Sequence, residues 1–588
     1  MPGRYLILSG RCRDLRARLM HGLPRHDLGI VLELDDLLIL SSPDLPIVML
    51  DGGRGVIIGE LFSREPPFET AHTLPRAAQR AIVDGVRGDA LIRDFWGHYV
   101  AALVESDGRN LTILRAPFGS LGAYHVSAED GIAITPDVGL LGDLGLMPGG
   151  VDWDSVARHV IAPNLRMHRT CLLGVAELMG GYGLSITSGK FTLFEAWNPW
   201  RFTDRRDNLT DDVEAVELLR RCVDGCVGAL ARTTNHAVLG VSGGLDSSIV
   251  AAALAQSGAK LSCLTLFTRD AAGDERRFAR ILAGHLGVQL FEMFEDVAHV
   301  DVTRSDAAHL PRPIARGFAQ SGDRSNLAVA RNVGADTFFS GGGGDNVFCY
   351  LQSAAPVADC LMTGRLRQLW PTARDISQIA DCSIWTALRS GVRRACFGSR
   401  TYRWRPELAF LTAQMAAEGP SACISLWADA PQDALPGKAT HVAWLIGILN
   451  HLEGYGRERS HRTVWPLMAL PIIELCLRIP SWMWSRGGQN RALARRAYAN
   501  ALPSDILERR SKGTPDSFVV ELFEANRERI RQLLCDGLLA ANGIVNRDEI
   551  ASFLVDKGPV RGLGYWRIMA LTDVEAWLQT VGSNRNTA

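Results

Sequence analysis

The segment from Ser242 to Ser248, Ser-Gly-Gly-Leu-Asp-Ser-Ser, combines residue types that suit a site for phosphate groups. An apolar run over 236–241 predicts a buried strand before it, and residues 247–256 predict a helix after it. The first N–H groups of such a helix point into the turn, where glycines let a ligand approach and serines donate hydrogen bonds. Asp246 would repel phosphate, so its carboxylate fits only if a divalent cation lies between the two.

The order of these residues resembles the Ser-Gly-Gly-x-Asp-Ser signature of the ATP pyrophosphatase superfamily, and no Gly-Lys-Ser/Thr of a Walker loop follows. Members of that superfamily cleave ATP between the α- and β-phosphates, and most of them adenylate a substrate. The alternative is an ordinary strand–turn–helix corner with a glycine pair. The resemblance implies ATP and Mg²⁺ as cofactors, with the nucleotide held by Val241, Ser242, Gly243, Gly244, Asp246 and Ser247.

A second acidic motif follows another apolar strand, since residues 336–348 read Asp-Thr-Phe-Phe-Ser-Gly-Gly-Gly-Gly-Asp-Asn-Val-Phe. Its four glycines leave room for a large group, although a glycine run alone is often only a loose loop. We place this motif one crossover after the first. Asp345 is then the natural partner of Asp246 for Mg²⁺ on the pyrophosphate, and Gly341 joins the nucleotide contacts.

Two more residues gain a role from the resemblance. Lys512, in the segment 509–518, matches the lysine that this family places at the α-phosphate, where a fixed ammonium stabilises the charge that grows during adenylation. Most lysines are only solvated loop residues, which is the alternative here. Leu266, near the end of a predicted strand over 261–268, is a candidate neighbour of the adenine, and an ordinary core leucine is the alternative.

The elements that position these motifs divide into two halves. Before residue 200 we predict short strands and a few helices, a pattern that suits a two-sheet α+β domain. After a polar linker over 201–212 and a helix over 211–232, strands alternate with helices, which implies a parallel sheet with ligands at the carboxyl ends of its strands. The strands predicted in the first half span 4–8, 31–40, 46–50, 56–62, 99–105 and 110–115, and its helices span 74–86 and 151–160.

Three phrases of the first half, at 95–103, 113–124 and 174–181, resemble the glutamine-amidotransferase domain of asparagine synthetases. In that family a cysteine at the second position attacks glutamine. Here that position is Pro2, which has no nucleophilic side chain, and Cys12 lies far from the terminus that the mechanism needs. The resemblance therefore implies a retained scaffold without glutaminase activity.

The predicted fold class is a multidomain α/β protein. Residues 1–205 would form an N-terminal Ntn-hydrolase-like α+β two-sheet domain without its nucleophile. Residues 206–588 would form a C-terminal α/β parallel-sheet ATP-pyrophosphatase domain with added helices, similar to the synthetase domain of asparagine synthetases.

The later phrases look most like lasso-peptide cyclases, which are asparagine-synthetase homologues that close a macrolactam in a ribosomal peptide. They are the four-glycine loop, the Arg-Ser-Lys-Gly of 510–513 and an apolar stretch over 465–480 that we read as one helix. Gly342 stands where asparagine synthetases have a glutamate and β-lactam-forming relatives have a catalytic tyrosine, and Asn346 replaces a second acid. Glycine can play neither part, and we expect it to widen the pocket for a folded peptide.

This resemblance implies an ATP-dependent carbon–nitrogen ligase that forms AMP and pyrophosphate. An Asp or Glu side chain of a precursor peptide would be adenylated and then attacked by the N-terminal amine of the peptide. That amine has a pKa of about 8 and is partly neutral at pH 7, so a strong base is less necessary. The expected partners are the precursor peptide, a leader peptidase and a leader-binding protein.

Composition narrows the function classes. The chain has 588 residues, of which 47% are hydrophobic, and a net charge of −1, which suits two or more globular domains and argues against a general nucleic-acid binder. Scattered cysteines, and the lack of a signal peptide or long apolar run, predict a cytoplasmic protein without a membrane partner. The basic and aromatic stretch 391–405 could contact single-stranded nucleic acid, a peptide or a partner, but a helix end or interdomain contact is favoured.

The main alternative is an asparagine synthetase-like amide ligase acting on a small carboxylate. A non-catalytic binding protein that kept the fold is a second, and the intact Asp246, Asp345 and Lys512 argue against it. A tRNA-modifying enzyme is a third. Near-neutral charge and the amidotransferase-like first half count against it.

Overall fold

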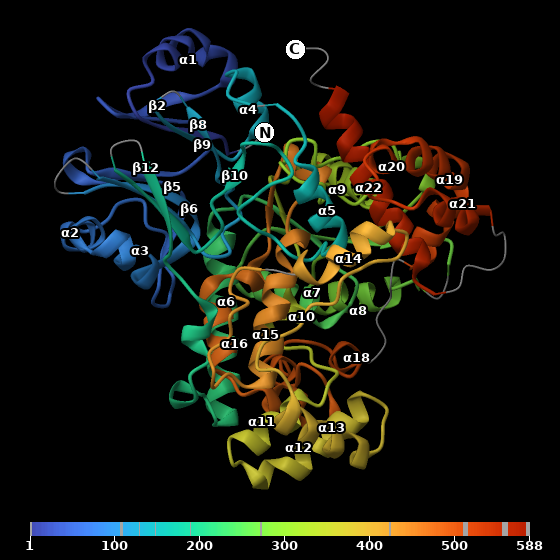
Figure 1. Cartoon of the computed structure of the whole chain (residues 1–588). Coiled ribbons are helices and arrows are strands. Elements are labelled where there is room, and N and C mark those ends of the chain that lie inside the picture. Colours follow the sequence, from blue (N-terminus) through green and yellow to red (C-terminus); the bar gives the residue numbers. More distant parts are fainter. Residues whose placement is uncertain are drawn as a thin grey trace.

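Three sheets organise the chain in a computed structural model (Figure 1). The structure describes residues 3–105, 110–128, 130–147, 149–187, 190–270, 273–422, 425–509, 516–555 and 562–583. Two six-stranded antiparallel sheets are built from the first third of the chain, and a five-stranded parallel sheet follows. The predicted multidomain α/β architecture with two antiparallel sheets and one parallel sheet is confirmed.

The first antiparallel sheet has helices on one face and the second sheet on the other, and its edge strand β2 is largely exposed. Its strands are, in spatial order, β10 (Ala176–Glu177), β8 (Tyr124–Ala128), β9 (Gly131–Thr135), β1 (Tyr5–Ser9), β3 (Leu37–Ser41) and β2 (Gly29–Leu34). Because successive side chains of a strand point to opposite faces, Tyr5 and Ile7 join the core shared with the second sheet, whereas Leu6 and Leu8 pack beneath helices. Those helices include α1 (Arg13–His26), α4 (Val138–Asp143) and α5 (Trp153–Ile161).

The second sheet lies against the first. Its strands are, in spatial order, β12 (Lys190–Glu195), β11 (Tyr182–Thr187), β7 (Asn110–Arg115), β6 (Phe95–Val104), β5 (Gly55–Ser63) and β4 (Ile47–Met49). The short helices α2 (Arg76–Asp84) and α3 (Asp89–Asp94) accompany it. The strands predicted over 99–105 and 110–115 are confirmed as parts of β6 and β7, which pair as a hairpin, and residues 106–109 between them lie outside the described residues.

Helix α1 is one of several elements of this half that the sequence analysis did not predict, and four arginines interrupt its apolar pattern. Cys12 precedes it and is buried, 1% exposed, with its Sγ 3.4 Å from Oδ1 of Asp130. Burial inside the first sheet's outer core agrees with a structural thiol.

The parallel sheet has the order β15 (Gln289–Phe294), β14 (Leu261–Phe267), β13 (Ala237–Gly240), β16 (Thr337–Phe339) and β17 (Arg462–Val464). Successive strands run outward from β13 to β15, and the chain then returns to place β16 on the other side of β13. The second motif is therefore not one crossover from the first, as predicted, but three strands later in the chain. Reversal of the strand order creates a crevice beyond the carboxyl ends of β13 and β16.

Helices surround this sheet. Helix α6 (Asp212–Arg232) begins at Asp211, whose Oδ1 accepts hydrogen bonds from the N–H groups of Val213 and Glu214 at 2.9 Å. The others are α7 (Leu245–Gln256), α8 (Arg276–Leu286), α9 (Ala319–Val333), α10 (Gly344–Val347), α11 (Ala355–Met362), α12 (Leu366–Ile379), α13 (Ile384–Phe397), α14 (Ala413–Ala422), α15 (Pro436–Gly447), α16 (Leu470–Arg478), α17 (Ala492–Ala497), α18 (Ser504–Leu507), α19 (Asp516–Asp536), α20 (Leu538–Ala541), α21 (Arg547–Val555) and α22 (Gly564–Ser583). In the described part of the chain, none of the helices combines the length and apolarity needed to cross a membrane.

The single helix predicted over 465–480 is wrong. A 3₁₀ turn at Pro466–Met468 is separated from α16 by Ala469, whose ψ of 134° is extended. Pro466 and Pro471 each lie in the first turn of their own helix, which is where proline is tolerated. The break matters because it turns Trp465 and Met468 toward the second motif.

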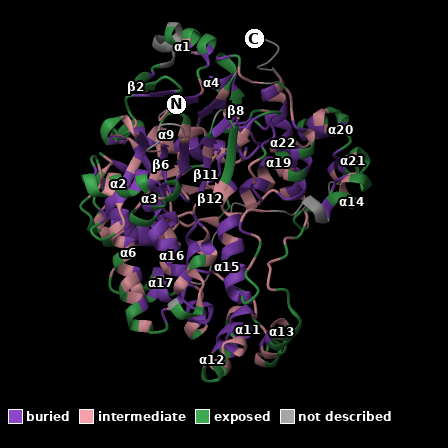
Figure 2. Ribbon diagram, turned by 60° about the vertical axis from the view of Figure 1, so that its left-hand side comes forward, coloured by how far each residue is buried: buried purple, intermediate pink, exposed green. Residues whose placement is uncertain are grey.

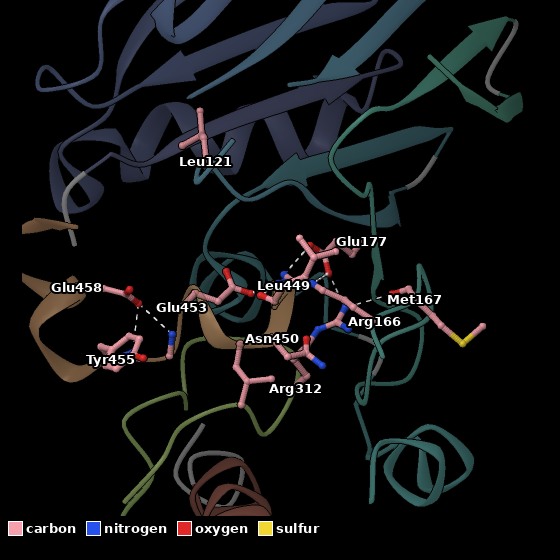
Figure 3. Close-up of polar contacts among 12 residues, drawn as sticks. Leu121, Arg166, Met167, Glu177, Arg312, Leu449, Asn450, Glu453, Tyr455 and Glu458 are labelled. Atoms are coloured by element: carbon pink, nitrogen blue, oxygen red, sulfur yellow. Dashed lines mark hydrogen bonds and ion pairs between the residues drawn. The ribbon is translucent and has the colours of Figure 1, made fainter. Parts of the chain in front are cut away.

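A buried ion cluster joins the two antiparallel sheets to the parallel-sheet half (Figure 3). Glu177 is fully buried and accepts hydrogen bonds from Arg115 at 2.7 Å, Arg166 at 2.6 Å and Arg312 at 2.5 Å. Arg166 also pairs with Glu453, which follows α15. Burial alone would raise the pKa of Glu177, but the three guanidinium groups hold that pKa well below its usual range.

We predict that Glu177→Gln lowers the free energy of unfolding by about 3–5 kcal/mol, because three buried cations lose their shared carboxylate. Urea and thermal denaturation would measure this loss. Since the pKa of Glu177 is depressed, its contribution is present above the ordinary glutamate pKa, so the difference should persist from about pH 8 to about pH 5. Asp94→Asn, which removes an exposed pair with Arg93, should cost less than about 1 kcal/mol, and equal losses in both variants would contradict the cluster's importance.

Candidate functional site

The two acidic motifs meet at a cavity of about 670 Å³ beyond the carboxyl ends of β13, β14 and β16. Several side chains at its far end, such as Tyr350 and Ile448, come from segments that neither motif contains. The predicted site residues that line it are Val241, Ser242, Gly244, Asp246, Ser247, Leu266, Gly341 and Asp345. The fold thus brings together most of the residues singled out from the sequence.

The first motif presents the beginning of a helix to this cavity. The N–H of Val241 donates to the carbonyl of Leu264 at 2.7 Å, which continues the sheet by one residue before the chain turns. Helix α7 then begins after Gly244, and no side chain caps its first N–H groups. The N–H groups of the first turn of a helix and the helix dipole favour an anion at this point, as expected for a phosphate site.

Gly243 has a different role from its neighbours. It does not line the cavity. Its backbone adopts a left-handed conformation with φ of 62°, and a Cβ there would collide with Phe278 of α8. Gly243 therefore lets the loop lie flat on α8, which fixes where α7 begins.

The glycines of the second motif allow the two loops to touch. A Cβ on Gly341 would lie 2.5 Å from the backbone nitrogen of Ser247, and a Cβ on Gly344 would collide with the carboxyl group of Asp246. This contact brings Asp345 beside Asp246. Glycine at these two positions is thus a steric requirement for the acidic pair.

Arg491 bridges the two carboxylates. Its Nη1 donates to both oxygens of Asp246 at 2.9 Å and to Oδ1 of Asp345 at 2.6 Å. Burial alone would lower the pKa of Arg491, but the two carboxylates raise it. The residue has a left-handed backbone with φ of 55°, a conformation that costs about 1–3 kcal/mol in a residue other than glycine and tends to occur at functional sites.

The acidic pair suits a magnesium ion that phosphates help to bind. Among the residues that the structure describes, no three His, Cys, Asp or Glu side chains are grouped to hold a metal. Mg²⁺ in nucleotide enzymes commonly takes only one or two carboxylates and completes its shell with phosphate oxygens and water. The guanidinium of Arg491 lies where such a cation would neutralise Asp246 and Asp345, which shows that this point attracts positive charge.

Glu295 is a cavity residue that the sequence analysis missed. It follows β15 and lines the cavity. Its side chain lies near that of Leu266, because both approach within 3.3 Å of the position that a Cβ on Gly322 would occupy. Burial raises the pKa of Glu295 to about 7. Its place directly after a predicted strand of a parallel sheet was the available signal. Arg491 gave none, because its partners lie far away in the sequence.

Lys512 lies outside the described residues. The chain just before it is attached to the first motif, since Nη1 of Arg509 donates to the carbonyl of Ser242 at 2.8 Å. Arg509 also pairs with Glu275 at 2.5 Å. Both contacts hold the end of this segment at the cavity, which Arg509 itself lines.

Gly342 does not widen the pocket as predicted. A Cβ at this position would collide with the indole of Trp465, and one at Gly343 would collide with Met468. Trp465 and Met468, which follow β17, fill the space beside these two glycines. The wall of the cavity at this point is therefore backed by aromatic and thioether side chains.

Comparison with known proteins supports a family assignment for this half. The asparagine synthase family model matches residues 217–579, which include both acidic motifs, Arg491 and Lys512. No curated protein matches the chain. Among solved structures, an allosteric regulatory enzyme of purine biosynthesis is 8% identical, with 50% of this chain and 80% of that chain covered and a TM-score of 0.21. A glutamine phosphoribosylpyrophosphate amidotransferase from B. subtilis, complexed with ADP and GMP, is 10% identical, with 57% and 90% covered and a TM-score of 0.21.

We predict that Arg491→Gln strengthens Mn²⁺ binding several-fold in the absence of nucleotide, because the metal no longer competes with a guanidinium for Asp246 and Asp345. Electron paramagnetic resonance of free Mn²⁺ would measure the affinity. Arg277→Gln, an exposed position, provides the matched control. Unchanged or weaker binding in the Arg491 variant would show that the carboxylates do not form a cation site.

We also predict that Glu295 makes nucleotide binding depend on pH. Because burial raises its pKa to about 7, Glu295 is neutral at pH 6 and ionised at pH 8, where its charge repels a polyphosphate. The dissociation constant of Mg·ATP should therefore rise between pH 6 and pH 8, and less so in Glu295→Gln. Titration calorimetry at both pH values would measure the difference, and parallel pH profiles would refute it.

Proposed function

The chain belongs to the asparagine synthase family of ATP-dependent amide ligases, and we propose that it is a macrolactam synthetase that closes an isopeptide ring in a ribosomal precursor peptide, as in lasso-peptide biosynthesis. One observation carries the chemistry: at the ends of two parallel strands, Asp246 and Asp345 both accept a hydrogen bond from the same nitrogen of Arg491. Around them lie the anion-binding helix start and a cavity large enough for a nucleotide.

In the proposed reaction the triphosphate lies on the N-terminus of α7. Ser242 and Ser247 supply hydroxyl groups there, and Asp246 and Asp345 would hold Mg²⁺, which would supply positive charge to offset that of the pyrophosphate. Arg491 then gives up part of its contact with the acidic pair, and its charge remains available to the phosphates.

Adenylation would begin with an Asp or Glu side chain of the peptide. Its carboxylate oxygen attacks the α-phosphorus of ATP, the α–β bond breaks, and pyrophosphate leaves. The N-terminal amine of the peptide then attacks the acyl carbon, loses a proton, and expels AMP. We assign Lys512 to the α-phosphate, where an ammonium stabilises the negative charge of both transition states.

The second step has little need of a strong base. An α-amino group has a pKa of about 8, so a substantial fraction is neutral near pH 7. Asn346 cannot act as a base, and its side-chain amide donates to the carbonyl of Trp444 at 2.7 Å. We assign Asn346 to anchoring the glycine loop on α15.

The N-terminal half, residues 1–205, acts in this proposal as a scaffold for the synthetase half, residues 206–588. In this proposal the nucleophile is the N-terminal amine of the peptide rather than ammonia from glutamine. The Glu177 cluster supports the structural role, because it ties strands β7 and β10 to the loop before α9. We further assign a leader peptidase and a leader-binding protein as the proteins that prepare the peptide.

A second candidate is an amide ligase that acts on a small carboxylate. Trp465 and Met468 fill the room beside Gly342 and Gly343, which narrows that side of the cavity and favours a small acceptor. AMP release that depends on aspartate together with ammonia or small amines would favour this candidate.

We predict that the purified protein, with ATP, Mg²⁺ and the leader-free precursor peptide encoded beside its gene, removes one water from the peptide and forms AMP. Mass spectrometry and nucleotide chromatography would measure both products. Asp246→Asn and Asp345→Asn should each lower the rate by about 10²-fold or more, because the leaving pyrophosphate is poorly screened. Asp36→Asn, an exposed substitution far from the cavity, serves as control. ADP as product, or full activity of both variants, would contradict the proposal.

A further inference from the structure

Helices α11, α12 and α13 form a lobe that extends from the parallel-sheet half, at the bottom of Figures 1 and 2. Its inner side is well anchored. The carboxylate of Asp359 on α11 is fully buried and accepts hydrogen bonds from the N–H of Gly437 at 2.8 Å and the hydroxyl of Ser481 at 2.6 Å. The lobe has its own small core, formed by Val357, Ala373, Ile376 and Ala387.

The outer side of the lobe carries a cluster of exposed apolar side chains, which we call the lobe patch: Leu366, Trp370, Trp385 and Val392. Trp370 and Trp385 are 53% and 69% exposed and contact each other across α12 and α13, with ring centroids 5.9 Å apart. Leu366 lies one helical turn before Trp370, and Val392 two turns after Trp385, so both extend the same surface. Scattered exposed apolar residues are ordinary, but a contiguous group of large ones marks an interaction site.

Arginines surround the lobe patch. Residues 363–405 contain nine arginines, no lysine and only two acids, in a chain whose net charge is −1. One of the acids, Asp375, is buried, and the arginines at 367, 374, 389 and 393 are exposed. Arg389 and Arg393 follow Trp385 by one and two turns, which places positive charge between and beside the apolar side chains.

Arg374 pairs with Asp375 at 3.7 Å. In the stretch 391–405, Arg394 donates to the hydroxyl of Thr440 at 3.3 Å and Arg400 approaches the sulfur of Met362 at 2.8 Å, so part of it makes contacts within the parallel-sheet half rather than between the two halves. Arg393 is exposed on the patch side instead. Burying such a surface against a partner gains roughly 25 cal/mol for each Å² of apolar area.

We propose that the lobe patch binds an acidic polypeptide segment of a partner protein, whose apolar side chains pack on the two indoles while its carboxylates pair with the surrounding arginines. Tryptophan and arginine are the residues that most often dominate protein interfaces, and an apolar centre with a charged rim is the usual arrangement. The strong local excess of positive charge selects an acidic partner.

The geometry favours a polypeptide over two other anionic partners. Successive nucleic-acid bases stack on parallel aromatic faces, whereas the rings of Trp370 and Trp385 are inclined at 75°. A membrane-surface helix separates its apolar and basic faces, whereas Arg389 lies on the same stripe of α13 as Trp385 and Val392.

The test uses the full chain and two fluorescein-labelled synthetic peptides, one with leucine, tryptophan and glutamate at helical spacing and one with lysine in place of every glutamate. Fluorescence anisotropy should show binding of the glutamate peptide alone, with affinity that falls as salt rises from about 50 mM to about 500 mM. The double variants Trp370→Ala/Trp385→Ala and Arg389→Glu/Arg393→Glu should each weaken binding by about tenfold or more. Phe191→Ala and Arg277→Glu, both exposed elsewhere, should leave it unchanged.

Three results would overturn the proposal. The first is equal binding of the two peptides, or equal binding by the parent and both patch variants. The second is tighter binding of an oligothymidylate than of the glutamate peptide, which would assign the patch to nucleic acid. The third is binding of vesicles of anionic phospholipid that the patch variants lose while the glutamate peptide does not bind, which would assign it to a membrane surface.

Discussion

The contact of two carboxylates with one guanidinium nitrogen is the constraint on which the parallel-sheet half depends. Asp246 and Asp345 lie on loops whose backbones touch, and the guanidinium between them offsets the repulsion of the two like charges. Gly341 and Gly344 make the close approach possible, and the neighbouring strands β13 and β16 give both loops the same direction. The strained backbone of Arg491 indicates that the arginine is held in place by its surroundings.

Much of this arrangement could be predicted from the sequence because its determinants are local. The strand–turn–helix of the first motif follows from an apolar run, a glycine pair and a helix-forming segment. The pairing of Asp246 with Asp345 follows from the rule that parallel strands end at the same edge of a sheet. Arg491 and Trp465 escaped prediction for the opposite reason, because each reaches its place beside the two motifs through tertiary packing. Gly342 shows why a glycine alone does not predict open space: Trp465 occupies the position that a side chain at Gly342 would take.

The antiparallel sheets are closely integrated with the rest of the chain. Besides the Glu177 cluster, Glu474 of α16 accepts a hydrogen bond from the indole of Trp197 at 2.8 Å and pairs with Arg64. One apolar core also runs from β5 and β6 into α6 and α16. Removing the first half would expose this core and leave several buried charges without partners. Structural dependence of this kind supports a scaffold role for the first half.

The same packing bears on which amine the proposed reaction would accept. An amine that approaches the acyl-adenylate beside Gly342 and Gly343 would lie against backbone that Trp465 and Met468 back, and burial there favours its neutral form. A lysine side chain has a pKa about 2.4 units above that of an α-amino group, so neutralising lysine at the same pH costs about 3 kcal/mol more. A cavity without a strong base beside Gly342 would therefore discriminate against lysine and accept an N-terminal amine. In the proposed reaction, the glycine at position 342 both leaves the cavity without a basic side chain there and favours an N-terminal amine as the nucleophile.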